Sequence, residues 1–150
     1  MPLKPRTILN AAIAVAILAA VGVLAHLHVA SQTYYPVVKL SSPEGLTLTM
    51  VQDPVSERRA CGEANGRFLA PLRSGCKKCA VVYARCEREL EGVEFALLNS
   101  QPVPHHQVLA DGMRLMVEGS KQIERDACES IAVDIVKMGI ASAACVFPRK

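Results

Sequence analysis

The chain has 150 residues, of which 51% are hydrophobic, and a formal net charge of +3. Of its 17 Lys and Arg residues only Lys4 and Arg6 precede residue 31, which leaves 15 basic against 14 acidic residues in the rest of the chain. This near balance argues against a nucleic-acid-binding surface, which needs concentrated positive charge. Trp is absent and aromatic residues make up 4% of the chain, so no platform for stacking bases or sugar rings is expected.

The stretch 8–30 is strongly apolar and contains no acidic residue, Lys or Arg. About 20 such residues in a helix cross the roughly 30 Å hydrocarbon layer of a bilayer. We therefore predict a cytoplasmic tail over 1–7 and a transmembrane anchor over 8–30. Because Lys4 and Arg6 precede the anchor and the next cation is Lys39, the amino terminus is expected in the cytoplasm and the rest of the chain outside.

Two other interpretations concern the same segment. A secretory signal cleaved after Ala25 would release the domain, although the apolar run is long for the hydrophobic part of a signal. Ala12, Ala16 and Ala20 share one helix face, and small residues at this spacing allow two membrane helices to approach closely. A homodimer through this face is therefore a hypothesis, beside the simpler explanation that Ala is common in this chain.

Residues 31–44 are predicted to form an extended linker, because Tyr35-Pro36 and Ser42-Pro43 favour extended backbone and no hydrophobic period is visible. The remaining stretch, 45–150, is long enough for one domain with one core. Hydrophobic periodicity and turn residues predict its elements. In chain order they are a strand over 46–51, a helix that ends at Ser74-Gly75, a strand over 80–85, a connection over 87–104 with one or two helical turns near 95–98, a hairpin with strands over 106–109 and 113–117, a helix over 120–138 and a strand over 141–147.

Two segments of this domain resemble each other. Residues 46–61 align without gaps on residues 113–128 with five identities in 16 positions. Each segment covers a predicted strand and the start of the helix after it, and each helix is followed by another strand. We therefore predict an α+β domain of two βαβ-like halves, with an antiparallel or mixed sheet and both helices on one face, as in the ferredoxin-like plan. Chance similarity between two amphipathic helices is the alternative.

All six cysteines follow the predicted anchor, so they are expected in an oxidising compartment and predict a disulfide framework. In a βαβ unit the start of the helix lies near the end of the following strand. A cysteine early in each helix is therefore expected to bond the cysteine of the next strand, and the two that remain are expected to bond each other. The expected pairs are Cys61–Cys86, Cys128–Cys145 and Cys76–Cys79.

The Cys-Lys-Lys-Cys motif at 76–79 is the short motif with a possible redox mechanism. It follows a predicted helix instead of opening one, so the helix dipole that lowers a thiol pKa in thioredoxin-like enzymes is missing. A structural bond is the main expectation, and a thiol–disulfide redox protein using Cys76 and Cys79 is the alternative. A zinc knuckle that adds Cys86 is disfavoured by an oxidising compartment.

Two polar clusters are interpreted as ordinary surface features. His105 and His106 are neighbours at the start of a predicted strand, where adjacent side chains point to opposite faces, so they are not expected to share a metal. Four cations gather near one helix end and the turn after it, where contact with anionic lipid headgroups or an acidic polymer is the alternative to solvent. These cations are Arg67, Arg73, Lys77 and Lys78.

No glycine-rich phosphate loop, Gly-x-Ser-x-Gly motif or catalytic carboxylate pair is visible, so no catalysis, cofactor or metal is expected. The absence of Asn-x-Ser/Thr sequons and the Ala- and Arg-rich composition favour a bacterial envelope. We predict a single-pass protein of the bacterial inner membrane with a periplasmic domain, an accessory or interaction part of an envelope assembly for polysaccharide export or secretion. Its predicted partners are the lipid bilayer, through 8–30, and an envelope protein.

Overall fold

The computed structural model describes residues 16–23 and 32–148. Residues 16–23 are helical and belong to an N-terminal unit, and a second compact unit spans Thr33–Lys150. Among the described residues, no helix combines the length and the apolar character that a membrane span requires. The predicted tail and most of the predicted anchor, including Ala12, lie outside the described residues, whereas Ala16 and Ala20 fall in the helical stretch.

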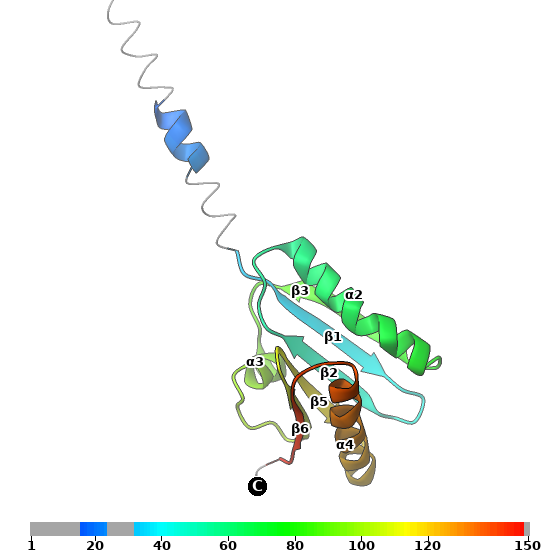
Figure 1. Cartoon of the computed structure of the whole chain (residues 1–150). Helices are drawn as coiled ribbons and strands as arrows, with labels where there is room; N and C mark the ends of the chain where they lie inside the picture. Colours follow the sequence, from blue (N-terminus) through cyan, green and yellow to red (C-terminus); the bar gives the residue numbers. More distant parts are fainter. Residues whose placement is uncertain (1–15, 24–31, 149–150) are drawn as a thin grey trace, which may run out of the picture. The chain divides into compact units, whose positions relative to one another are not determined.

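Within residues 32–148 the centre of the fold is a six-stranded sheet in which all neighbouring strands are antiparallel (Figure 1). The strand order is β3-β1-β2-β5-β4-β6. The strands are β1 (Tyr35–Ser41), β2 (Thr47–Gln52), β3 (Ala80–Glu87), β4 (His106–Ala110), β5 (Met113–Glu118) and β6 (Ala143–Val146). The helices of this unit are α2 (Arg58–Gly75), α3 (Gly92–Leu98) and α4 (Lys121–Lys137).

Strand β1 lies inside the stretch 31–44, so the prediction of a linker is wrong for Tyr35–Ser41. β1 is an interior strand that pairs with β2 on one side and β3 on the other. Val37 and Val38 are adjacent residues of β1, and both are fully buried. Val38 belongs to the hydrophobic cluster on one face of the sheet and Val37 to the cluster on the other. A strand buried on both faces shows no alternation of apolar and polar residues, which is why its periodicity was not visible.

The domain consists of two halves with the same order of elements, β1-β2-α2-β3 and β4-β5-α4-β6. In each half the helix joins two parallel strands that lie on either side of the first hairpin strand. β2 and β5 join the halves, and Thr49 pairs there with Met116, its own counterpart in the sequence alignment. This register is the one that a two-fold axis between the halves requires, and it supports an internal repeat over chance similarity.

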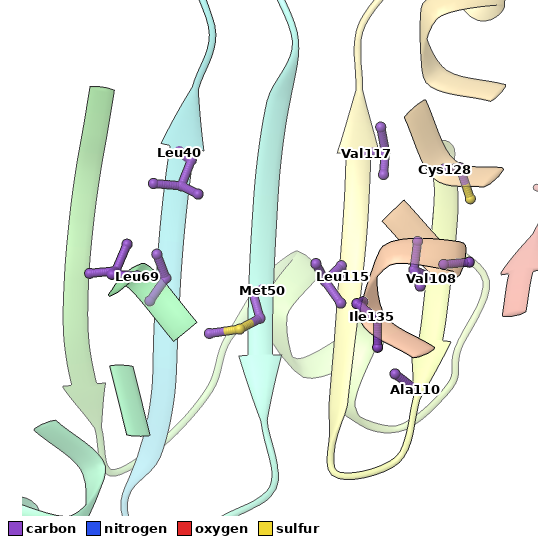
Figure 2. Packing of buried hydrophobic residues seen from close by; sticks show 11 residues of the cluster. Leu40, Met50, Leu69, Val108, Ala110, Leu115, Val117, Cys128 and Ile135 are labelled. Atoms are coloured by element: carbon purple, nitrogen blue, oxygen red, sulfur yellow. The ribbon is translucent and has the colours of Figure 1, made fainter. Parts of the chain in front are cut away.

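Two hydrophobic clusters lie on opposite faces of the sheet. α2 packs on β1 and β3, and α4 packs on β4, β5 and β6. Figure 2 shows Leu69 of α2 and Ile135 of α4 on the same face of the sheet, together with Met50 and Leu115 from the central strands. α3 packs on β2 and β5 from the opposite face, where Leu97 is fully buried.

Three disulfide bonds are present in this unit: Cys61–Cys86, Cys76–Cys79 and Cys128–Cys145. They are the pairs expected from the sequence. The first and the third each tie a helix to the strand that follows it, and their helical members are fully buried. The second bond spans the turn between α2 and β3.

The lengths of the closed loops predict unequal contributions to stability. Cys128 and Cys145 are 17 positions apart, and the chain-entropy model gives a loss of about 3 kcal/mol when both become Ala. Cys76 and Cys79 are 3 positions apart, and the same double substitution there is expected to cost about half as much. Urea unfolding of the two double variants measures the difference, and equal losses would contradict the model.

Candidate functional site

An apolar groove lies between α2 and α4 on the face of the sheet opposite α3. It consists of two adjoining hollows of about 590 and 320 Å³. The hollows share four lining residues, Phe68 and Pro71 of α2 together with Ile135 and Met138 of α4 and its C-terminal end. Volumes of this size are typical of sites that bind small or elongated ligands, for which a range of roughly 300–1,000 Å³ is usual.

The lining of the groove is drawn from both halves in equivalent pairs. Each pair is separated by 67 positions in the sequence, the offset that also aligns β2 with β5. The pairs are Leu48 and Leu115, Ala64 and Ile131, Phe68 and Ile135, and Pro71 and Met138. The groove therefore lies on the internal two-fold axis. The sequence signal for it is the apolar stripe of α2, in which Ala64, Phe68 and Leu72 fall on one helix face.

The equivalence between the halves ends at the charged rim of the groove. Arg67 lines the larger hollow, and its counterpart in α4 is Asp134, which lines the smaller one. Asp134 lies 3.2 Å from Lys137 Nζ and is therefore neutralised locally. Arg67 is exposed and forms no ion pair within residues 32–148. The rim on the α2 side is thus positively charged.

More positive charge lies at the carboxyl end of α2. Arg73, Lys77 and Lys78 are exposed, and none of them has an ion pair in the described part of the chain. The sequence contains no acidic residue between Glu63 and Glu87 that would balance them. The four cations singled out in the sequence therefore form an uncompensated basic strip along and beyond α2.

The Cys76–Cys79 bond lies at this same end of α2. Cys76 caps the helix and lines the smaller hollow, and Cys79 directly precedes β3. The motif therefore occupies the negative end of the helix dipole, which disfavours a thiolate, unlike the N-terminal position that activates redox thiols. In this place the bond closes the turn between α2 and β3 at one end of the groove.

A second polar cluster lies away from the groove, around Glu124 in the first turn of α4. This side chain is buried, and its carboxylate oxygens lie 2.8 Å from His105 Nδ1 and 3.0 Å from His106 Nδ1. The Gly119 N–H donates a further hydrogen bond of 3.0 Å. The interpretation of the two histidines as a surface pair is wrong, since His106 is buried. Both rings reach one carboxylate because His105 lies before the first residue of β4. The rule that adjacent side chains of a strand point to opposite faces therefore does not apply to this pair.

This cluster links β4 to α4. Burial acts to raise the pKa of Glu124, but the hydrogen bonds from His106, from the Gly119 backbone and from His105 hold the pKa below its ordinary value of 4.5. The charged form of Glu124 is therefore favoured in the folded state. Among the described residues, no group of three or more His, Cys, Asp and Glu side chains is arranged to hold a metal ion. The arrangement fits a structural role, in which Glu124 of α4 is hydrogen-bonded to the histidines at the start of β4.

The lowered pKa of Glu124 predicts its effect on stability. A carboxyl whose folded pKa is depressed stabilises the fold above its unfolded pKa, here about 4.5, and this contribution is lost as the pH falls through the lower folded value. Glu124→Gln is expected to cost about 1–3 kcal/mol at pH 7 and progressively less in acid. Thermal unfolding between pH 3 and 7 measures this, with the exposed Glu129→Gln on the same helix as control. A loss independent of pH would contradict the assigned charge.

On the opposite face of the sheet, three side chains fasten α3 to β3. The Tyr83 hydroxyl donates a hydrogen bond of 2.8 Å to Glu94, and the Arg85 guanidinium lies 2.9 Å from the same carboxylate and 4.3 Å from the Tyr83 ring. Burial and the neighbouring Glu94 raise the pKa of Tyr83 to about 12. Tyr83 thus stays protonated as a hydrogen-bond donor, which fits a structural role.

Comparison of the chain with protein-family models, with curated proteins and with solved structures finds no match. The functional argument therefore starts from the groove and its rim.

Proposed function

We propose that this protein is a membrane-anchored binding module of the bacterial envelope. Residues 8–30 anchor it in the inner membrane. The disulfide-bonded α+β domain, built on the ferredoxin-like plan of two βαβ-like halves, faces the periplasm. The domain acts as an accessory or interaction part of an envelope assembly of the polysaccharide-export or secretion type. The groove between α2 and α4 is its binding site for a small or elongated ligand. Self-association through Ala12, Ala16 and Ala20 belongs to the same proposal.

The observation that carries the proposal is the partly exposed apolar groove. Phe68 and Leu72 are half-buried, and Met138 remains 54% exposed. These side chains would stabilise the fold more if they were fully packed in a closed core. Contiguous apolar surface that is left partly exposed in this way marks binding sites. The ionisable side chains that line the two hollows are Arg67 and Asp134, both at the rim. This lining suits binding better than proton transfer.

The disulfides support the extracytoplasmic location. Among the described residues no cysteine is free. Bonds of this kind persist in the periplasm and are rare in the reducing cytoplasm. The competing function, a redox protein that uses Cys76 and Cys79, needs a bond that is easily reduced. A reduction potential below about −300 mV indicates a structural bond, whereas a value between about −120 and −270 mV would favour the redox protein.

Topology in intact cells tests the proposal. A carboxyl-terminal reporter that is active only outside the cytoplasm is expected to be active, and a thiol reagent is expected to modify no cysteine until the protein is reduced. A variant that lacks residues 1–30 is the matched control, since it should remain in the cytoplasm with all six thiols free. A cytoplasmic reporter on the full chain, or free thiols in it, would overturn the proposal.

A further inference from the structure

We infer that the groove between α2 and α4 binds one acyl chain of an anionic phospholipid, with the head group at the end lined by Arg67 and Gln52. This inference rests on the proposed function, because the anchored domain would draw the lipid from its own membrane. It goes further in assigning the chemistry of the ligand and the residues that recognise it.

The size and lining of the groove fit an apolar chain. The two hollows adjoin through the four residues that they share, and together they have 15 lining residues. A specific protein partner usually contacts about 20–30 residues on each side, so the groove is small for a docked protein. Its floor and walls are mainly Leu, Ile, Phe, Met and Pro side chains. A long hydrocarbon chain satisfies such a surface without demanding hydrogen bonds.

The charge of the rim selects an anionic head group. Arg67 lines the larger hollow and has no ion pair within residues 32–148. A guanidinium can donate two parallel hydrogen bonds to a phosphate, which makes Arg the usual residue for phosphate recognition. Lys77 and Lys78 follow Cys76 beside the smaller hollow, so Arg67 is the cation that marks the head-group end of the groove. An anionic lipid is therefore preferred over a zwitterionic one.

A buried donor without a partner lies at the same end of the groove. Gln52 lines the larger hollow together with Arg67, and its Nε2 is buried without a hydrogen-bond partner among the described residues. Buried donors are nearly always satisfied, so one that is not calls for an acceptor. A phosphate or ester oxygen next to Arg67 would supply it. The counterpart of Gln52 in the second half is Gly119, so this donor belongs to one end of the groove alone.

Photo-crosslinking of the full-length protein in lipid vesicles tests the inference. The vesicles carry a phosphatidylglycerol, or in parallel a phosphatidylcholine, with a photoreactive group on its acyl chain. Crosslinks from phosphatidylglycerol are expected in the α2 and α4 segments that line the groove. About tenfold fewer are expected from phosphatidylcholine, because its choline ammonium is repelled by Arg67 and offsets the phosphate charge, at a cost of about 1.4 kcal/mol. Equal crosslinking of both lipids, or crosslinks confined to 8–30, would overturn the inference.

Matched variants separate the groove from the rest of the surface. Met138→Glu places an anion in the groove and should abolish the α2 and α4 crosslinks, whereas Val136→Glu, similarly exposed on α4 but outside the groove lining, should retain them. Arg67→Glu should lower phosphatidylglycerol crosslinking about tenfold, with Arg58→Glu as the unaffected control on the same helix. Loss of crosslinking in the control variants as well would contradict the assigned site.

Gln52→Leu distinguishes a ligand-binding role of Gln52 from a purely structural one. Replacing a buried, unsatisfied donor by an apolar side chain should raise the melting temperature of the lipid-free protein while it weakens lipid crosslinking. A variant that loses both stability and crosslinking would contradict the role of Gln52. The topology experiment is independent of these results: a periplasmic domain without groove crosslinks overturns only the lipid assignment, whereas a cytoplasmic domain overturns the proposed function itself.

Discussion

The antiparallel pairing of β2 with β5 is the contact on which the domain depends. In the described sheet it is where strands from the two halves meet, and each half alone would be a three-stranded sheet with one large helix. Met50 and Leu115 face each other across this pairing and are at most 1% exposed. Cross-strand contacts of this kind are the main stabilising unit of a sheet. α3 covers the same two strands on one face of the sheet. On the other face, Leu48 of β2 and Leu115 of β5 line the groove.

The two halves repeat the apolar chemistry of the groove but not its polar chemistry. Hydrophobic residues recur at equivalent positions because both helices must cover the same kind of sheet surface. Arg67 is replaced by Asp134 in the second half, and Gln52 by Gly119. An apolar ligand that met only the repeated lining could enter in either of two orientations. The unrepeated polar groups distinguish the two ends, so they give the groove a direction.

Local chemistry made much of the fold predictable. Asp111-Gly112 indicates a hairpin and Gly139 a helix end, and both glycines adopt the positive φ that favours glycine at such places. The features that the sequence did not reveal depend on tertiary contacts. β1 looks like a linker until its burial on both faces is known, and the burial of His106 follows from the approach of α4. Sequence periodicity likewise identifies the apolar face of α2 without indicating that part of it borders a groove.

None of the three disulfides in the described residues joins one half of the domain to the other. Two of them close the first half and one closes the second, so each half is covalently braced while the boundary between them relies on hydrogen bonds and side-chain contacts. Reducing agents would therefore remove covalent constraints from each half separately. They would break no link across the boundary, where Met50 and Leu115 pack against each other.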